Sequence, residues 1–472
     1  KNLLSHLFML YNLEINFSNL SISSRTTDPK TDIFITFYQH QKEYYNYYEI
    51  NDIYLPYHLS QQINATKLFY PTNTDLETIQ FFLKYIFRFD EFREGQYEAI
   101  KRTLERKDSI VLLPTGAGKS IAFQLASLLL PGITIVVEPI ISLIDDQIDN
   151  LCLMGIDRVV GITGQILNIK IKNEYIEAFG RGEYLFCYVA PERFQIESFR
   201  KIIITLSTSI PVSLIAIDEA HCVSEWGHDF RTSYLNIGKT CRSVCSYYGE
   251  NPPVLALTGT ASHSVLKDVQ RELEITEFDA IITPKTFDRQ ELNFEVITVN
   301  TDKKKDAIKG LLTSKLPDFF HRSFSLLYTT ANNSICGLLF CPHVNGSHGV
   351  VEICNWIQNS LDIPSAFYSG KAPSNRDTYH WMKQKKEIAS QFKNNEVNLL
   401  VATKSFGMGI DKPNIGFTIH YGLPNSIESF YQEAGRSGRN RQSSLCTLVV
   451  SNEHKKENTH LLNPNTDVEE IM

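Results

Sequence analysis

The chain has 472 residues, enough for about three domains, and its 43% hydrophobic content is that of a globular protein with several cores. Its 46 Lys and Arg against 53 Asp and Glu give a net charge of -7, which excludes an overall basic field that would draw the chain onto nucleic acid. No apolar run reaches the roughly 18 to 20 residues that span a bilayer, so we expect no membrane segment and an intracellular protein, cytoplasmic in a bacterium or nuclear in a eukaryote.

The nine cysteines are scattered, and several lie within apolar runs, which predicts buried free thiols in a reducing compartment. Two pairs, Cys241 with Cys245 and Cys336 with Cys341, have the spacing of half a zinc site. Neither pair has an adjoining second pair at the spacing of a structural site. We therefore expect no zinc site in this chain.

Residues 1–75 are rich in Tyr, Asn and Ile and carry no motif that indicates a chemistry, so this N-terminal extension stays unassigned. Two interpretations are open for it. The segment is the tail of an upstream domain or a partly ordered extension, or its tyrosines, dense at 44–48, stack on nucleic-acid bases. Because the chain begins with Lys1 rather than Met, we expect a fragment of a longer protein.

From Leu76 onward, short apolar strands alternate with helical stretches, a pattern typical of βαβ units around a buried parallel sheet. Expected strands of a first series lie at 110–113, 133–137 and 214–217, and those of a second series at 338–340, 365–368, 399–402 and 417–420. Pro284 and the polar run 300–305 break the pattern between the two series. The sequence predicts two α/β domains, at 76–285 and 286–455, followed by a tail at 456–472.

The strongest local signal is a glycine-rich segment between the expected strand 110–113 and a helical stretch at 121–130. It reads Pro114-Thr115-Gly116-Ala117-Gly118-Lys119-Ser120. Glycines let backbone N–H groups curl round an anion, while Lys119 would reach the terminal phosphates and Ser120 would ligate Mg²⁺. Leu113 stands where the general phosphate-loop pattern has its first glycine, so a glycine-rich turn without a nucleotide is the alternative.

An acidic pair, Asp218 and Glu219, follows the expected strand 214–217. Asp218 can hold the Mg²⁺ shell, and Glu219 can orient or deprotonate the attacking water. A solvated loop is the usual interpretation of a lone Asp-Glu pair. Behind a phosphate loop in the same sheet, the pair favours a nucleotide site instead.

The segment 218–231, Asp-Glu-Ala-His-Cys-Val-Ser-Glu-Trp-Gly-His-Asp-Phe-Arg, resembles motif II and the aromatic-rich loop of the RecQ family of helicases. The resemblance continues in residues 92–96 (motif 0), 138–147 (motif Ia), 256–261 (motif III), 401–413 (motif V) and 431–439 (motif VI). It implies an α/β fold of two RecA-like domains, each a parallel β-sheet flanked by helices, with the ATP cleft between them.

The resemblance also assigns roles to individual residues. Gln96 would read the adenine edge, with Arg93 assisting and Phe89 stacking on the ring, so ATP is the expected nucleotide. The remaining nucleotide-binding residues would be Thr115, Gly116, Ala117, Gly118, Lys119 and Ser120, with Ser120 and Asp218 as Mg²⁺ ligands. The catalytic set would be Lys119, Asp218, Glu219, His221, Gln432, Arg436 and Arg439. Arg439 with Arg436 would act as an arginine finger against the charge on the γ-phosphate.

DNA contacts are expected from the loop 221–231, which the family uses to sense single-stranded DNA. Trp226 and Phe230 offer flat faces for bases and Arg231 offers charge for the backbone. For the two rings, packing at the domain interface is the alternative. Strand-end loops would add hydroxyl and N–H donors for phosphates, which completes the expected DNA-binding set: Ser142, Trp226, His228, Phe230, Arg231 and Thr403.

These features predict an ATP-dependent DNA helicase that moves 3′ to 5′, a polarity implied by the family alone. Its expected partners are single-stranded DNA and tailed or forked duplexes, bound by a monomeric core; protein partners are unknown. The alternatives are an RNA helicase, a translocase that remodels protein on DNA, an ATP-driven DNA translocase, and a DNA-binding protein that uses ATP as a switch.

Five positions depart from the family pattern, among them Tyr368-Ser369-Gly370 in place of Tyr-His-Ala-Gly and Asn440 in place of an Asp after the second arginine of motif VI. Glu138 replaces a small polar residue of motif Ia, and we expect it to place a negative charge near a DNA phosphate. Arg88 stands where a glycine usually precedes the stacking aromatic residue, and Gly259 replaces an alanine of motif III. The zinc-binding and winged-helix regions of the family do not follow motif VI here, so we expect DNA-stimulated ATP hydrolysis more than processive unwinding.

Overall fold

The computed structural model describes residues 6, 9–10, 20–24, 33–39, 42–50, 57–59, 70–114, 116–164, 169–224, 231–259, 261–329, 334–374, 376–406, 412–424 and 426–451. The chain divides into two compact units, Lys1–Phe287 and Asp288–Met472, and each is described by itself. This division falls two residues beyond the domain boundary that we predicted. Among the described residues, no helix is long and apolar enough to cross a membrane.

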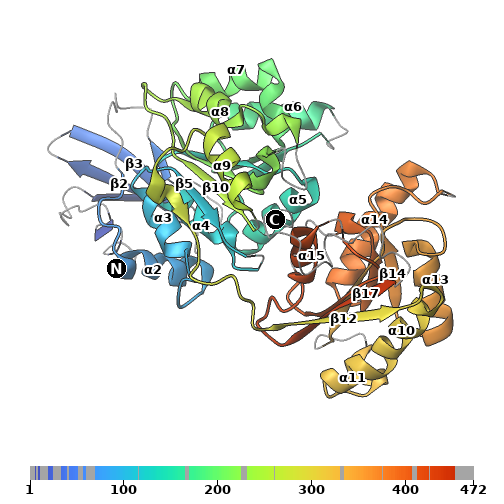
Figure 1. The fold of residues 1–472 in the computed structure, drawn as a ribbon. Coiled ribbons are helices and arrows are strands. Elements are labelled where there is room, and N and C mark those ends of the chain that lie inside the picture. Colours follow the sequence, from blue (N-terminus) through green and yellow to red (C-terminus); the bar gives the residue numbers. More distant parts are fainter. Residues whose placement is uncertain are drawn as a thin grey trace. The chain divides into compact units, whose positions relative to one another are not determined.

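A seven-stranded sheet forms the centre of unit 1, and Figure 1 labels two of its strands, β5 and β10. The strand order is β11-β5-β10-β9-β6-β8-β7, and every pair is parallel. Its strands are β5 (Ser109–Leu112), β6 (Ile133–Val137), β7 (Val159–Ile162), β8 (Phe186–Val189), β9 (Val212–Ile217), β10 (Val254–Thr258) and β11 (Ile281–Ile282). Every residue of β5, β6, β8, β9 and β10 is buried, as in a parallel sheet with both faces covered. The three strands predicted for this domain are confirmed.

Helices join these strands and cover the sheet of unit 1. They are α2 (Leu76–Phe82), η2 (Leu83–Phe87), α3 (Gln96–Leu104), α4 (Lys119–Leu129), α5 (Ile141–Leu153), α6 (Ile169–Gly180), η3 (Pro191–Gln195), α7 (Glu197–Leu206), η4 (Ala220–Val223), η5 (Thr232–Tyr234), α8 (Ile237–Cys245), α9 (His263–Glu272) and η6 (Phe278–Ala280). Successive residues of a strand point to opposite faces, so Val136 belongs to the same core as Phe123 of α4, whereas Ile135 belongs to the core that contains Phe179 of α6. The sheet therefore has a hydrophobic core on each face.

The N-terminal extension contains β1 (Leu20–Ser24), β2 (Ile33–Gln39), β3 (Lys42–Ile50) and β4 (Tyr57–Leu59), which form an antiparallel sheet in that order. Leu10 is buried, and its carbonyl oxygen accepts hydrogen bonds from Thr72 N at 2.9 Å and Asn73 N at 3.0 Å. The His6 ring stacks on Phe81 of α2 with centroids 3.5 Å apart. Because no side chain of β1 to β4 is described, both interpretations of the tyrosine-rich segment stay open.

Unit 2 is built on a six-stranded sheet in the order β12-β17-β16-β13-β15-β14, again with every pair parallel. Its strands are β12 (Leu292–Val299), β13 (Cys336–Phe340), β14 (Ser365–Tyr368), β15 (Leu399–Ala402), β16 (Ile415–His420) and β17 (Ser444–Ser451). The four strands that we predicted for this domain are among them. Trp381 and Phe392 of α14 and Phe417 of β16 are fully buried in its main core.

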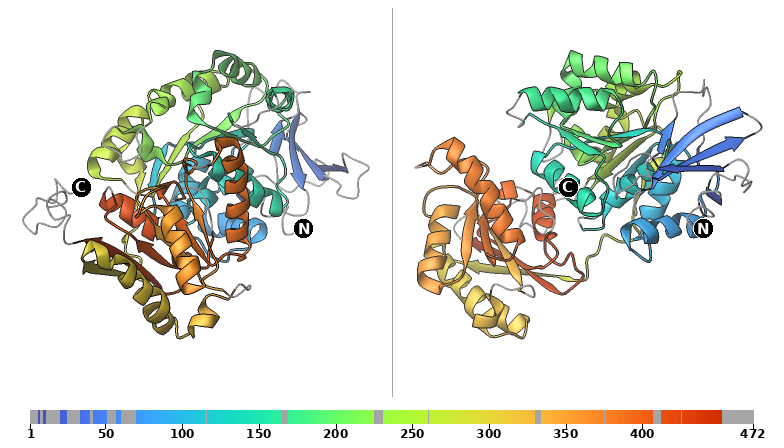
Figure 2. Two further views of the ribbon diagram at one scale, coloured as in Figure 1. Left: turned by 90° about the vertical axis from the view of Figure 1, so that its right-hand side faces the viewer. Right: turned by 180° about the vertical axis from the view of Figure 1, so that it is seen from behind.

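The helices of unit 2 follow its strands as in unit 1, and Figure 2 shows both units from two further sides with helices packed against their sheets. They are η7 (Thr301–Lys303), α10 (Lys304–Gly310), η8 (Leu311–Lys315), α11 (Leu316–Phe319), α12 (Phe324–Leu327), α13 (Val350–Leu361), α14 (Thr378–Lys393), η9 (Lys404–Phe406) and α15 (Ile427–Ala434). A small separate cluster of Leu292, Ala434 and Cys446 seats α15 against β12 and β17.

One expectation about the cysteines is wrong. Cys152 on α5 is exposed, whereas the other eight cysteines are buried thiols as predicted. The error arises because Cys152 lies between Leu151 and Leu153 in the sequence, which suggests an apolar run. On the helix, however, Leu151 points inward while Leu153 is 84% exposed.

Candidate nucleotide-binding and hydrolysis site

The glycine-rich segment forms a turn between β5 and α4. Gly116 and Gly118 have left-handed backbone conformations, with φ of +80° and +73°, that side chains with a Cβ rarely adopt. The helix α4 begins at Lys119 directly after Gly118, so its first N–H groups face the turn. This is the backbone arrangement that binds a phosphate anion at a helix N-terminus. Thr115 lies outside the described residues.

Motif 0 holds this turn in place, which the sequence did not predict. Gln96, at the start of α3, is 2% exposed, and its Nε2 donates hydrogen bonds to Ala117 O at 3.0 Å and Gly118 O at 2.9 Å. Its Oε1 accepts one from Arg93 N at 2.8 Å, and the Arg93 guanidinium donates to Gly116 O. Both amide hydrogens of Gln96 are used here, so pairing with adenine would require Gln96 to exchange one of these contacts. The adenine role of Gln96 and Arg93 stays a prediction.

Phe89, the expected stacking residue, is 49% exposed in the loop after η2. The preceding Arg88 has a left-handed backbone with φ of +62°, which explains why a glycine is usual at this position in the family. The Arg88 guanidinium lies over the Tyr85 ring at 5.7 Å from its centroid. Stacking of Phe89 on a nucleotide base stays a prediction.

The hydroxyl of Ser120 is oriented by two glutamines that sequence reasoning missed. Gln147 Nε2 on α5 donates to Ser120 Oγ at 2.7 Å, and Gln124 Nε2 on α4 donates to Gln147 Oε1 at 2.8 Å. Since the hydroxyl oxygen accepts from Gln147, its own hydrogen points elsewhere and a lone pair remains for a cation. The signal in the sequence was the presence of a glutamine in motif Ia on the helix after β6.

The acidic pair lies at the carboxyl end of β9, at the same edge of the parallel sheet as the phosphate loop. Asp218 is 8% exposed, and its Oδ1 accepts a hydrogen bond from Glu219 N at 2.9 Å. Burial, and then the charge of Glu219, raise the pKa of Asp218 to about 6, whereas Lys119 opposes the shift. A buried carboxylate and a serine hydroxyl, which follow strands at the same edge of the sheet, are hard-oxygen ligands of the kind that suits Mg²⁺, and the cation would relieve the cost of burying the charge. Ser120 and Asp218 therefore fit the predicted metal.

The structure corrects our expectation for Glu138. We expected its charge near a DNA phosphate, but Glu138 is 1% exposed and its Oε1 accepts a hydrogen bond from Ile140 N at 3.0 Å. Burial first, and then the charges of Asp218 and Glu219, raise the pKa of Glu138 well above its ordinary value. The physical reason is the sheet order: Val137 of β6 pairs with Ile217 of β9, so the residues that follow them, Glu138 and Asp218, become neighbours.

His221 links the acidic pair to the strand β10. It is 2% exposed, and its Nδ1 lies 3.0 Å from Thr258 Oγ1 and 3.4 Å from Glu219 Oε2. Glu219 itself has a left-handed backbone with φ of +47°. Tyr234 supports the same turn by donating its hydroxyl hydrogen to Asp218 O at 3.1 Å. Four of the predicted catalytic side chains thus lie in segments that follow strands β5 and β9 of unit 1: Lys119, Asp218, Glu219 and His221.

The structure describes the side chains of two of the six predicted DNA-binding residues, Arg231 and Thr403. Trp226, His228 and Phe230 lie outside the described residues, and the Ser142 side chain is likewise not described. Arg231 donates from Nη1 to Pro139 O at 2.8 Å. In unit 2, Thr403 is 9% exposed and its Oγ1 lies 2.7 Å from Ser405 Oγ. A role in DNA binding stays a prediction for all of them.

The predicted motif VI residues lie on and just after α15 in unit 2. Gln432 and Arg436 are buried, at 6% and 5% exposed, and Arg439 is half-buried. The helix is fixed to the sheet by Glu433, whose Oε2 lies 3.0 Å from Nε2 of the buried His420 on β16. The structure thus brings the three predicted residues onto one short segment.

Comparisons with known proteins agree with this geometry. A DEAD/DEAH box helicase family model matches residues 93–269, and a helicase conserved C-terminal domain model matches residues 322–441. The chain is 34% identical over 381 residues to the ATP-dependent DNA helicase RecQ of Bacillus subtilis, covering 80% of this chain and 56% of the relative. It is 32% identical over 364 residues to the probable ATP-dependent DNA helicase RecS of the same organism, covering 77% and 65%. The chain thus spans about half to two thirds of the length of these relatives.

Solved structures share the fold. Mss116p bound to ssRNA and AMP-PNP superposes with a TM-score of 0.61 at 18% identity, covering 81% of this chain and 74% of that one. The helicase MrfA bound to DNA superposes with a TM-score of 0.57 at 15% identity, covering 79% and 48%. At these identities the likeness concerns the fold alone. The predicted fold class, two RecA-like domains with parallel sheets flanked by helices, is confirmed.

Proposed function

Because this chain belongs to the DEAD/DEAH box helicases and its relatives include RecQ DNA helicases, we propose that it is an ATP-dependent DNA helicase. It translocates 3′ to 5′ on single-stranded DNA and unwinds tailed or forked duplexes, as a monomeric core, in DNA repair and recombination. One observation carries the ATPase part of this proposal. In unit 1, the phosphate loop after β5 and the Asp218-Glu219 pair after β9 lie at one edge of a parallel sheet.

ATP hydrolysis in this proposal uses the described residues of unit 1. The phosphates bind the N-terminus of α4, and Lys119 contacts the terminal phosphates. Ser120 and Asp218 would hold Mg²⁺, whose positive charge would stabilise the phosphate oxygens. Glu219 takes a proton from a water whose oxygen attacks the γ-phosphorus, and ADP leaves with the electron pair of the broken P–O bond. His221, between Glu219 and Thr258, orients the Glu219 carboxylate.

The remaining roles are assigned by likeness to the family. Gln432, Arg436 and Arg439 stabilise the charge that develops on the γ-phosphate. Phe89, Arg93 and Gln96 select adenine. DNA is contacted by Ser142, Trp226, His228, Phe230, Arg231 and Thr403, mostly through phosphates and stacked bases.

Two other functions use the same hydrolysis chemistry, so the ATP site does not separate them from a helicase. One is an ATP-driven DNA translocase that does not unwind, and the other is a DNA-binding protein switched by ATP. Mss116p is bound to ssRNA and MrfA to DNA, so the fold also accommodates both nucleic acids. Sequence likeness to DNA helicases favours DNA here.

Strand displacement tests the proposal. Duplexes with a single-stranded 3′ or 5′ tail are incubated with ATP, and release of the labelled strand is followed on gels. We expect release from the 3′-tailed duplex alone, and no release by Glu219→Gln, which keeps the shape of the site but lacks the base. Release of streptavidin from a biotinylated single strand without duplex unwinding would identify the translocase instead. Release from the 5′-tailed duplex alone would show that the proposed polarity is wrong.

A further inference from the structure

Arg289, the second residue of unit 2, makes contacts that the proposed ATP chemistry does not use. Its side chain is 7% exposed, and its guanidinium reaches the loop that follows α15. Nη1 donates a hydrogen bond to Gly435 O at 2.7 Å, and Nη2 donates one to Ser437 O at 3.0 Å. Gly435 O belongs to the peptide unit directly before Arg436, and Ser437 O belongs to the peptide unit between Ser437 and Gly438. One guanidinium thus binds the backbone before and after this motif VI arginine.

Glu291 completes the arrangement. Arg289 Nε donates to Glu291 Oε1 at 2.8 Å, and Glu291 O accepts a hydrogen bond from Ser444 N of β17 at 2.8 Å. Although burial acts to raise it, hydrogen bonds from its own backbone N–H and from Arg289 hold the pKa of Glu291 below its ordinary value. The carboxylate therefore stays charged and balances the buried guanidinium.

The loop itself fits closely over this pair. Gly438 has a left-handed backbone with φ of +65°, and a Cβ there would lie 2.9 Å from Glu291 Cγ and 3.0 Å from Ser444 Oγ. Gly438 N donates to Ile415 O at 3.0 Å, which ties the end of the loop to β16. Hydrogen bonds and close packing thus hold the backbone of residues 435–438, and Arg439 follows it directly.

Capping of α15 does not account for these contacts. The last carbonyl groups of the helix are already bound locally: Tyr431 O accepts from Gly435 N, and Ala434 O accepts from Ser437 N and Ser437 Oγ. Arg289 instead binds carbonyl groups beyond the helix, where no helical partner exists. Its contacts therefore fix the loop rather than the helix end.

We propose that Arg289, held by Glu291, is a positioning residue that fixes the 435–438 backbone so that Arg436 and Arg439 present their guanidinium groups to the γ-phosphate in one geometry. This inference rests on the proposed function, because it needs the motif VI arginines to act on ATP. Arg289 acts through them and does not itself contact the nucleotide. Because Arg289 lies 146 residues from Gly435 in the sequence, motif VI by itself does not reveal this residue.

The first measurement is the split between kcat and KM for ATP hydrolysis. A displacement of about 1 Å in a catalytic group costs on the order of 100-fold in rate, so Arg289→Met should lower kcat about 100-fold. The KM for ATP should change less than about threefold, because the phosphate loop of unit 1 binds the phosphates. Arg289→Lys keeps the charge but cannot bind both carbonyl groups with a planar guanidinium. Its kcat should therefore lie between those of wild type and Arg289→Met.

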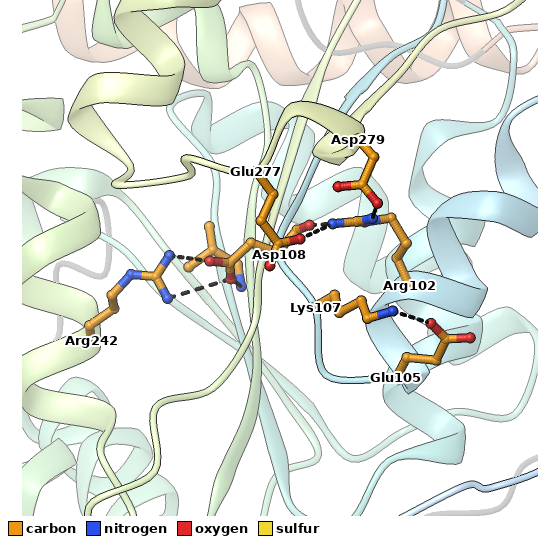
Figure 3. Close-up of polar contacts among 8 residues, drawn as sticks. Arg102, Glu105, Lys107, Asp108, Arg242, Glu277 and Asp279 are labelled. Atoms are coloured by element: carbon orange, nitrogen blue, oxygen red, sulfur yellow. Dashed lines mark hydrogen bonds and ion pairs between the residues drawn. The ribbon is translucent and has the colours of Figure 1, made fainter.

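Two variants separate positioning from stability. Arg289→Met combined with Glu291→Leu replaces the buried ion pair by apolar side chains, a change that often preserves folding, and should keep the kcat defect. Arg242→Met is the matched control in unit 1, where Arg242 Nη2 binds Asp108 Oδ2 at 2.7 Å (Figure 3). The same nitrogen also donates to Leu273 O at 3.2 Å. Like Arg289→Met, Arg242→Met loses an ion pair with a carboxylate and a hydrogen bond to a backbone carbonyl group. The folded Arg242→Met protein should keep the kcat of wild type. An equal kcat loss in Arg242→Met would overturn the inference.

A double-mutant cycle in a background that carries both Arg436→Ala and Arg439→Ala is the deciding test. If Arg289 acts through these two arginines, adding Arg289→Met should leave kcat nearly equal to that of the background. If the background lowers kcat and Arg289→Met lowers it again by its full factor, the proposed function stands and the positioning role of Arg289 is overturned. If the background leaves kcat unchanged, the arginine role in the proposed function is wrong and this inference falls with it.

Discussion

Replacing Asp218 by Asn is expected to make the metal-free protein more stable while it abolishes hydrolysis. Burial and the charge of Glu219 raise the pKa of Asp218 from its ordinary 3.8 to about 6. An acid whose pKa is raised by folding binds its proton more tightly in the folded state, so deprotonation destabilises that state. The difference corresponds to about 3 kcal/mol above pH 6, since each tenfold change in proton affinity is worth about 1.4 kcal/mol.

The sign of the effect sets its pH dependence. Below about pH 3.8 the carboxyl is protonated in both states and the cost is absent; it grows between pH 3.8 and pH 6 and is constant above. Asn removes the charge at nearly the same shape. Without metal, Asp218→Asn should therefore exceed wild type by up to about 3 kcal/mol at pH 7.5 and by about half of that at pH 5.

Hydrogen exchange in increasing urea, measured on peptides from β5 and β9 with EDTA present, reports the unfolding of unit 1 alone. Mg²⁺ should stabilise wild type and leave Asp218→Asn unchanged, because binding to the folded state adds to its stability. The control is Asp108→Asn, which weakens the contact with Arg242 shown in Figure 3 and should lower stability. An Asp218→Asn protein that is no more stable than wild type at pH 7.5, or whose gain in stability is the same at pH 5, would show that folding does not raise the pKa of Asp218.

Glycine substitutions give further predictions. Gly337→Ala should destabilise unit 2 by about 3 kcal/mol, because the new Cβ would lie 2.0 Å from the Phe417 ring. Gly310 lies on a helix and has nothing within 4 Å of the position that a Cβ would take, so Gly310→Ala should stabilise unit 2 by roughly 0.5 to 1 kcal/mol. Urea unfolding measures both changes in stability, and the same sign for Gly337→Ala and Gly310→Ala would contradict the role of packing. Gly118→Ala should weaken ATP binding about tenfold in a fluorescent-nucleotide titration, because φ of Gly118 is +73° and the new Cβ would lie 2.8 Å from Gln96 Nε2. An unchanged affinity for ATP would show that the turn adapts to the new side chain.

The sheets of this fold are largely predictable from sequence. Parallel strands buried on both faces are continuous apolar runs, so 133–137, 365–368 and 399–402 match β6, β14 and β15 residue for residue. The acidic pair was found for the same reason, because it follows directly after such a run. Local signals were sufficient wherever one strand and its own loop carry the chemistry.

Contacts that depend on the order of strands were not predictable. The prediction for Glu138 was wrong because Glu138 and Asp218 are neighbours only through the pairing of β6 with β9, which the sequence does not reveal. The partners of Gln96 and Ser120 lie on other elements than their own, at separations of 21 to 27 residues. The sequence contains no periodic pattern that shows which distant carbonyl or hydroxyl group a side-chain amide will bind.

The most direct test of the central claim is ATP hydrolysis by this chain with and without single-stranded DNA. The measurement is made beside an RNA of the same sequence and beside Lys119→Ala, which removes the first side chain of α4 without altering the sheet. We expect that DNA raises kcat severalfold, that RNA does so less, and that Lys119→Ala abolishes hydrolysis. Hydrolysis that DNA does not stimulate, or that persists in Lys119→Ala, would contradict the proposed function.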